Sequence, residues 1–172
     1  MARSFIAVKL GLEAEGKLEE LQNEAKQLGL VATFPSEFHC TLVFLGELDE
    51  SQLEKTKETL EGLELPKTEV EVEGTGFFPN SQFIRVFWAG VKGLDVLQEK
   101  IAKALDSRDE FTGHVTLARI KAPKNLEGLK LLAEKHGQAE FGRTIVEEIL
   151  LMKSTLSPQG PQYEVLFSKK LS

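Results

Sequence analysis

The sequence predicts an α+β protein of two pseudo-symmetric lobes, and three observations support this. Apolar residues recur at strand spacing in some segments and at helix spacing in others. The order strand, helix, loop, strand occurs twice along the 172 residues. Each copy ends in the same word, His-x-Thr-Leu, at 39–42 and at 114–117. We therefore expect residues 1–172 to form a single two-lobed domain with an internal duplication.

The first half of the chain alternates between apolar strands and charged helices. The helices are indicated by leucines and alanines three or four residues apart, and Asp49 is a suitable N-cap for the second of them. The segment 39–45, with the sequence HCTLVFL, is nearly all apolar, as in a strand that is buried on both faces. The predicted elements are strands at 4–10 and 39–45, helices at 13–28 and 50–61, and a connector at 33–37.

The second half repeats this alternation after a hairpin. Strict alternation of Thr, Val and Glu over 68–73 indicates a half-exposed strand, and Pro79-Asn80-Ser81 is a turn signal. The predicted elements are a hairpin of 70–78 and 83–89, helices at 92–105 and 125–136, and strands at 114–120, 143–153 and 163–169.

The duplication rests on the position of the histidines. The gap from Phe5 to His39 is 34 residues, and the gap from Phe83 to His114 is 31. After a histidine, composition alone places Thr at +2 and Leu at +3 roughly once in 100 times, yet two of the three histidines are followed in this way. Aligning the first strands of the copies puts Arg85 where the first copy has a small alanine, either lining a groove or reaching solvent. A pseudo-two-fold axis would bring His39 and His114 to face each other.

Charge and composition exclude several classes of protein. The net charge of −6 argues against broad, non-specific binding of nucleic acid. Residues 1–110 carry 12 basic and 21 acidic residues, whereas 111–172 carry 9 basic and 6 acidic ones, so an anionic ligand should contact the second half. The single cysteine, Cys40, allows no intrachain disulfide. The apolar run near the start is too short for a signal peptide, so we expect a cytoplasmic protein. We also expect a monomer that does not contact a membrane.

The two words place an imidazole and a hydroxyl on one strand face. Residues i and i+2 of a strand point the same way, so His39 lies beside Thr41 and His114 beside Thr116. Two facing pairs of this kind suit in-line displacement at phosphorus, because histidine transfers protons near neutral pH and threonine can hold the non-bridging oxygens. Arg119 follows His114 by five residues, an odd spacing, so only a bulge or the strand end would bring it to the phosphate.

These words resemble the 2H phosphoesterase superfamily, and the chain is most similar to the RNA 2′,3′-cyclic phosphodiesterase family, also called 2′-5′ RNA ligases. Further residues carry the resemblance over essentially the whole chain: residues 3–7, 39–46, 83–88, 111–119 and 151–163. The chain departs from many relatives in having Gly113 instead of proline before the second word, and no tryptophan in the loop before the first.

The resemblance implies a fold and an activity. The fold is two lobes, each an antiparallel sheet with outer helices, around a central groove that the two His-x-Thr strands line. The activity is hydrolysis of RNA 2′,3′-cyclic phosphate ends to 2′-phosphomonoesters without metal or cofactor, with His39 as proton donor and His114 as proton acceptor. If the same two proton transfers took place in reverse, the protein would join RNA ends through a 2′-5′ linkage. Thr41, Thr116 and Arg119 are the expected phosphate-binding residues.

Other interpretations stay open at this point. The enzyme could act on a small cyclic nucleotide or on 2′-5′ oligonucleotides, or the fold could be a non-catalytic nucleotide- or RNA-binding module. Zinc binding by the histidines is disfavoured, because neither word has a Cys, Asp or Glu on the same strand face. We interpret His136 as structural and Cys40 as a small buried residue. Three connector phenylalanines could either stack on a base or belong to the core: Phe34, Phe77 and Phe78.

Overall fold

The computed structural model describes all residues, 1–172, as four helices and nine strands. The helices are α1 (Leu12–Lys26), α2 (Glu50–Glu61), α3 (Asp95–Ala104) and α4 (Leu126–Lys135). The strands are β1 (Ala2–Val8), β2 (Val31–Thr33), β3 (Cys40–Leu48), β4 (Thr68–Asn80), β5 (Phe83–Lys92), β6 (His114–Ala122), β7 (Glu140–Val146), β8 (Glu148–Ser157) and β9 (Gly160–Lys170). None of the helices has the length and apolar character that a membrane span requires.

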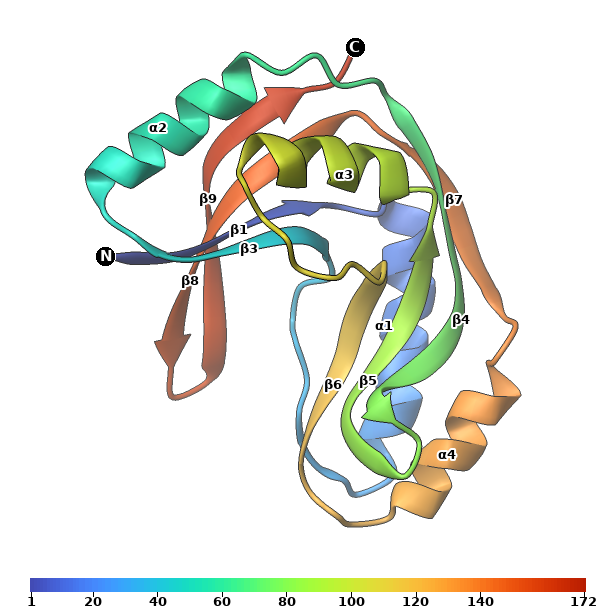
Figure 1. Cartoon of the computed structure of the whole chain (residues 1–172). Helices are drawn as coiled ribbons and strands as arrows, with labels where there is room; N and C mark the ends of the chain where they lie inside the picture. The colour runs from blue at the N-terminus through green and yellow to red at the C-terminus, as the bar shows by residue number, and fades with distance from the viewer.

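The strands form two antiparallel sheets (Figure 1). The four-stranded sheet has the order β3-β1-β8-β9, and the five-stranded sheet has the order β2-β6-β5-β4-β7. Apart from the short edge strand β2, the two orders correspond strand for strand, with β3 matching β6 and β1 matching β5. The predicted α+β architecture of two antiparallel lobes is therefore confirmed, whereas a duplication as its origin stays a prediction.

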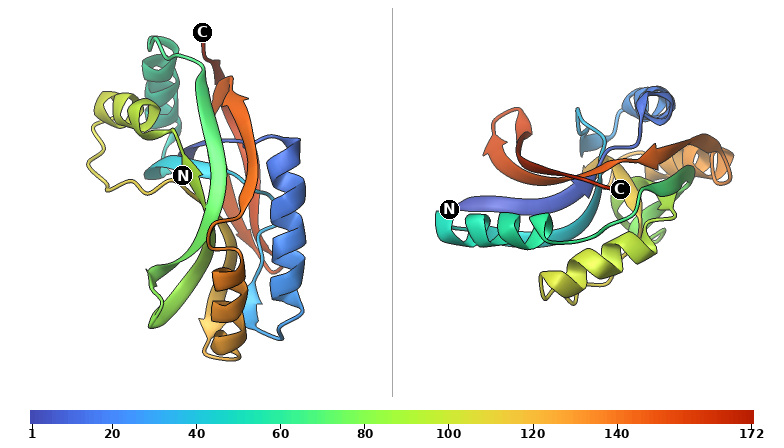
Figure 2. Two further views of the ribbon diagram at one scale, coloured as in Figure 1. Left: turned by 90° about the vertical axis from the view of Figure 1, so that its right-hand side faces the viewer. Right: turned by 90° about the horizontal axis from the view of Figure 1, so that it is seen from above.

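The helices join the two halves, because each first helix packs on the opposite sheet. Helix α1 follows β1 in the chain but packs against β6 and β7, and α3 follows β5 but packs against β3. Helix α2 lies beside α3 on the four-stranded sheet, and α4 lies beside α1 and β4 (Figures 1 and 2). One continuous core of 33 buried residues fills the space between these elements. Neither sheet is covered by its own half alone.

Three boundaries differ from the sequence prediction. The strand expected over 143–153 is two strands, since the chain leaves the five-stranded sheet at Val146 and enters the other at Glu148. The adjacent pair Glu147-Glu148 interrupts the apolar pattern at this crossing, but two charged residues alone do not show that the chain changes sheets. The edge strand β2, which pairs with β6, was not predicted and ends at Thr33, the first residue of the expected connector. Helix α3 begins three residues later than expected, because β5 continues to Lys92 and Gly93 turns the chain at a φ of 104°.

A β-bulge follows the threonine of each His-x-Thr-Leu word. Adjacent residues of β1 pair with Val43 and Thr41, so Leu42 is an extra residue in β3. In the same way, adjacent residues of β5 pair with Ala118 and Thr116 of β6, with Leu117 as the extra residue. An extra residue reverses the alternation of side chains beyond it. The two residues after each threonine are both buried, and the next one is exposed on the same face as the threonine.

This bulge corrects the expected direction of Arg119. On a regular strand Arg119 would face away from His114, but the extra residue Leu117 returns Arg119 to the face of His114 and Thr116. In the other lobe the same step puts Phe44 on the face of Thr41.

The strand register also corrects the alignment of the two copies. Thr41 lies opposite Ala7, and Thr116 lies opposite Trp88. Ala7 therefore corresponds to Trp88 and not to Arg85, which lies three residues earlier. The matching residue pairs Phe5-Ile6 and Phe83-Ile84 suggested the wrong register between the two copies.

Each bulge is held by a buried glutamine from the opposite half. The Gln22 side chain of α1 donates to the carbonyl oxygen of Leu117 at 3.1 Å and to that of Pro35 at 2.8 Å. The Gln98 side chain of α3 donates to the carbonyl oxygen of Leu42 at 3.3 Å. A bulge leaves its extra residue outside the strand ladder, and buried carbonyls need a partner. The glutamines supply that partner, so the crossed helices fix the strand shape at both words.

We expect the glutamines to differ in their contribution to stability. Replacing Gln22 with Met keeps the side-chain length but leaves the carbonyls of Pro35 and Leu117 without a donor. Each unsatisfied buried group costs on the order of 1–3 kcal/mol. Gln22→Met should therefore lower the free energy of unfolding in urea by roughly 2–4 kcal/mol. Gln98→Met should cost about half as much, since only Leu42 loses its donor.

A matched control is Gln27→Met at the end of α1, where the side chain is exposed. Its effect should stay within about 0.5 kcal/mol. Equal stability of all three variants would contradict the role given to the buried amides.

Candidate active site

His39 lies one residue before β3, between two aromatic rings of the four-stranded sheet. The imidazole stacks on Phe5 of β1 with a centroid distance of 5.2 Å, and it meets the edge of Tyr163 of β9 at 4.9 Å. Burial is the main cause that lowers the pKa of His39 to about 4, and the charges of Arg119 and Lys9 lower it further. His39 is therefore neutral in the free protein at pH 7.

His114 is the first residue of β6 and is held by the backbone before it. Its Nδ1 lies 2.7 Å from the carbonyl oxygen of Thr112. A carbonyl oxygen only accepts, so Nδ1 carries the proton, and Nε2 of the neutral ring has a free lone pair. Burial lowers the pKa of His114, the hydrogen bond to Thr112 opposes this, and the charge of Arg119 adds to the decrease. The ring is therefore prepared to accept a proton at Nε2.

The wall behind His114 is aromatic. Phe78 of β4 meets the imidazole edge-on at 4.8 Å, and Trp88 of β5 lies at 6.2 Å. The indole covers Gly76, where an added Cβ would come within 2.2 Å of the ring. The indole Nε1 is buried and has no hydrogen-bond partner. Glycine at 76 is thus needed for the indole to occupy this position.

Several observations indicate that the segments 39–42 and 114–117 lie near each other. Strands β3 and β6 are in contact although they belong to different sheets. The thiol of Cys40 interacts with the backbone of His114, and the charge of Arg119 acts on both histidines. Arg119 also lies near the Tyr163 hydroxyl, where it opposes the increase in the pKa of Tyr163 that burial causes. The charge of one guanidinium thus acts on both imidazoles and on the tyrosine.

The threonines fit the expected arrangement. Thr41 and Thr116 are half-buried, as are His39 and His114, whereas the residues between them are fully buried in the core. Each histidine therefore shares a partly open face with its threonine. On β6 the same face also carries the exposed Arg119.

The remaining residues singled out from the sequence have other surroundings. Burial raises the pKa of the Cys40 thiol to about 12, so it stays protonated and does not serve as a nucleophile. His136 lies after α4 and its Nε2 is 3.1 Å from a carboxylate oxygen of Glu24, which ties α4 to α1 outside the site. Phe34 and Phe77 pack against the core, whereas Phe78 contacts His114.

Sequence reasoning missed the aromatic residues that enclose the histidines. Tyr163 and Phe5 reach His39 from strands that are distant in sequence and paired only through β8. The signal for Trp88 was its position opposite Thr116, which the wrong alignment of the copies concealed.

A pocket of about 410 Å³ lies on the side of His39 that faces α1. Its walls include three carboxylates, of Glu15, Glu19 and Glu37, and two ammonium groups, of Lys9 and Lys26. Nowhere in the chain do three or more His, Cys, Asp or Glu side chains converge as a metal site would require. Of the two histidines, only His39 lines this pocket.

Known proteins of similar sequence share one description. Residues 10–88 match the family described as LigT like Phosphoesterase. The chain is 33% identical to an RNA 2′,3′-cyclic phosphodiesterase of Methanocaldococcus jannaschii, over 95% of this chain and 98% of that protein. It is 35% identical to an RNA 2′,3′-cyclic phosphodiesterase of Aeropyrum pernix, over 90% of this chain and 95% of that protein.

Solved structures with the same fold are also known. A crystal structure of a protein from Thermus thermophilus superimposes with a TM-score of 0.81 at 29% identity, covering 98% of this chain and 97% of that one. The crystal structure of E. coli LigT complexed with 3′-AMP gives a TM-score of 0.72 at 20% identity, covering 99% and 98%, and shows the same fold. The chain therefore belongs to the RNA 2′,3′-cyclic phosphodiesterase family of LigT-like 2H phosphoesterases.

Proposed function

We propose that this protein hydrolyses the 2′,3′-cyclic phosphate at an RNA end to a 2′-phosphomonoester. The observation that carries the proposal is the pair of histidines with different surroundings on facing strands. Water attacks phosphorus as the bond to the 3′ oxygen breaks. His114 takes the proton from the water, and His39 gives a proton to the leaving 3′ oxygen. Family membership and the names of the relatives support the choice of substrate.

The tautomer of His114 supports its role as base. The carbonyl of Thr112 holds the proton on Nδ1, so Nε2 remains free to receive the proton from water. The lowered pKa keeps the ring neutral at pH 7, which is the state that a base needs.

His39 needs the opposite state, and the substrate can supply it. In the free protein its pKa is about 4, because the ring is buried beside Arg119 and Lys9. A bound phosphate brings a negative charge that offsets both cations and attracts a proton to the ring. Thr41, Thr116 and Arg119 hold the non-bridging oxygens in this scheme, as charge-assisted hydrogen bonds to phosphate are strong. The same two groups would run the reverse, 2′-5′ joining reaction.

The direct test uses an oligonucleotide that ends in a 2′,3′-cyclic phosphate, incubated with the protein in EDTA. We expect full activity and a 2′-phosphate product, identified by its position on the ribose. Loss of activity to the chelator with recovery in zinc or manganese would contradict the mechanism. A 3′-phosphate product would contradict the choice of leaving oxygen.

The two histidine roles can be separated by the leaving group. His39→Ala and His114→Ala should each lower the rate by about 10²–10⁴-fold, the usual contribution of a positioned acid or base. A phosphodiester with a nitrophenol leaving group needs little protonation, so it should restore much of the rate to His39→Ala and almost none to His114→Ala. The third histidine gives a control, His136→Ala, which should retain activity. Rescue of His114→Ala instead would exchange the two roles.

The pH dependence follows from the two lowered pKa values. In the free protein, His39 loses its proton above about pH 4, and His114 gains one as the pH falls below its own lowered pKa. The kcat/KM profile reports free-protein ionisations, so it should be bell-shaped with its maximum below pH 6.5, the ordinary value for histidine. Bound phosphate raises the pKa of His39, so the basic limb of kcat should lie at higher pH. A flat kcat/KM between about pH 5 and 8 would exclude histidine as acid and base.

A further inference from the structure

A strip of basic side chains leads away from the candidate active site along β5 and β6. It consists of Arg119 and Lys121 on β6 and of Phe83 and Arg85 on β5, and we call it the β5–β6 strip. All four are exposed, whereas Ile84 and Ile120, which separate them, are buried in the common core. The strip therefore lies on one solvent face, opposite the face that packs on α1. In Figure 1, no helix lies in front of the lower halves of these strands.

The charge of the strip is not neutralised within the protein. The chain has a net charge of −6, yet β5 and β6 contain no Asp or Glu. Neither Arg85 nor Lys121 forms an ion pair, whereas Lys92 at the other end of β5 pairs with Glu73. The two free cations lie where an anionic chain leaving the site would pass.

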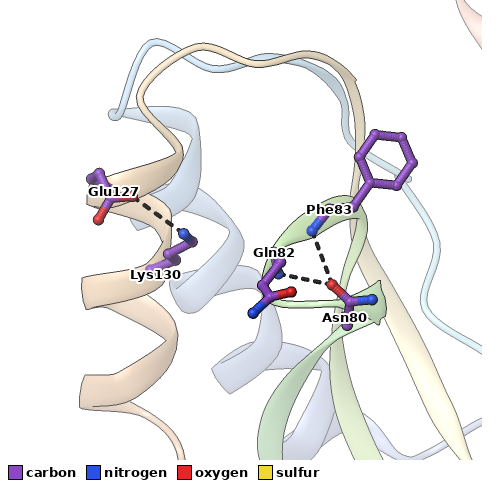
Figure 3. A network of polar contacts seen from close by, with 5 residues as sticks. All are labelled: Asn80, Gln82, Phe83, Glu127 and Lys130. Atoms are coloured by element: carbon purple, nitrogen blue, oxygen red, sulfur yellow. Dashed lines mark hydrogen bonds and ion pairs between the residues drawn. The ribbon is translucent and has the colours of Figure 1, made fainter.

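The far end of the strip carries an exposed aromatic ring. Phe83 is 57% exposed, and the guanidinium of Arg85 lies 4.8 Å from the centre of its ring. The Asn80 side chain accepts hydrogen bonds from the backbone N–H groups of Gln82 and Phe83, which fixes the turn (Figure 3). The ring points away from α4 in that view. An arginine stacked on a phenyl ring offers a flat surface of the kind on which bases stack.

The strip is continuous with the phosphate-binding face. The pairing of β5 with β6 ends where Val86 lies opposite Arg119, so Arg85 and Lys121 lie one and two residues beyond the last pair. From Thr116 to the end of β6 is roughly 15–20 Å at about 3.3 Å per residue, which exceeds one nucleotide. The pocket on the His39 side is the other route for a bound chain, but its three carboxylates outnumber its two ammonium groups, whereas the strip carries cations alone.

We propose that the β5–β6 strip binds the nucleotides that precede the terminal cyclic phosphate, so that the substrate is an RNA chain and not a mononucleotide. Arg85 and Lys121 contact backbone phosphates, and Phe83 stacks on a base. This inference rests on the proposed function, since only an RNA that ends at the two histidines would be directed along the strip.

The test compares two substrates that share the reacting group. One is a nucleoside 2′,3′-cyclic monophosphate, and the other is a hexanucleotide ending in the same nucleoside cyclic phosphate. The natural protein should prefer the hexanucleotide by tenfold or more in kcat/KM. The double variant Arg85→Ala/Lys121→Ala should lose this preference while its kcat/KM for the monophosphate stays within twofold. The slope of log KM against log salt for the hexanucleotide should fall by about 0.7 for each lost contact.

A matched control removes the same charge from the outer helices. Lys55→Ala/Lys100→Ala changes two exposed lysines on α2 and α3 and should keep both the preference and the salt slope. Phe83→Ala should lower kcat/KM for the hexanucleotide about tenfold, within the range for loss of one base–aromatic stack, without changing the salt slope.

The outcomes separate the two proposals. If neither substrate is hydrolysed, the proposed function is wrong. If both are hydrolysed equally well, or if the strip variant keeps the preference of the natural protein, the proposed function stands and the RNA-binding strip is overturned.

Discussion

The bulge after each threonine is the constraint on which the site depends. One extra residue, Leu42 in β3 or Leu117 in β6, decides which side chain joins the histidine and threonine on the open face. The bulge is kept in place by a buried amide from the opposite half, Gln98 or Gln22. The packing of each helix on the opposite sheet therefore fixes the bulge in that sheet, and the bulge in turn sets which side chains line the site. A change in either helix would reach the site through the carbonyl that it holds.

A nearly symmetric frame produces an asymmetric site. The position that follows the bulge is Phe44 in one lobe and Arg119 in the other, so the single guanidinium comes from the second half. His114 is fixed by a backbone carbonyl, whereas His39 lies between aromatic rings without such a bond. These surroundings prepare one imidazole as a base and leave the other to be protonated when an anion arrives. In the mechanism that we propose, the acid and base roles follow from the neighbours of each histidine and not from the shared word.

The sequence was sufficient for the features that repeat and insufficient for those that depend on pairing. The two words and the periodicity of the helices predicted the two antiparallel lobes, whereas the pairing of His39 with His114 in one site stays a prediction. The bulge had a local signal, because two apolar residues in succession, Leu117 and Ala118, follow Thr116. Counting strict alternation from His114 to Arg119 did not use that signal. The crossing at Glu147 had only a weak signal, the pair Glu147-Glu148 between two apolar segments, which does not show that the chain changes sheets. The place of Tyr163 beside His39 follows from strand order, which a single sequence does not state.

The most direct measurement of the central claim is a ¹⁵N NMR titration of the ring nitrogens, with and without a nucleoside 2′-monophosphate. We predict that His39 titrates near pH 4 in the free protein and at distinctly higher pH in the complex. We predict that His114 remains neutral at pH 7 in both, with its proton on Nδ1. Two histidines that titrate together near their ordinary pKa of about 6.5, unchanged by the ligand, would contradict the account.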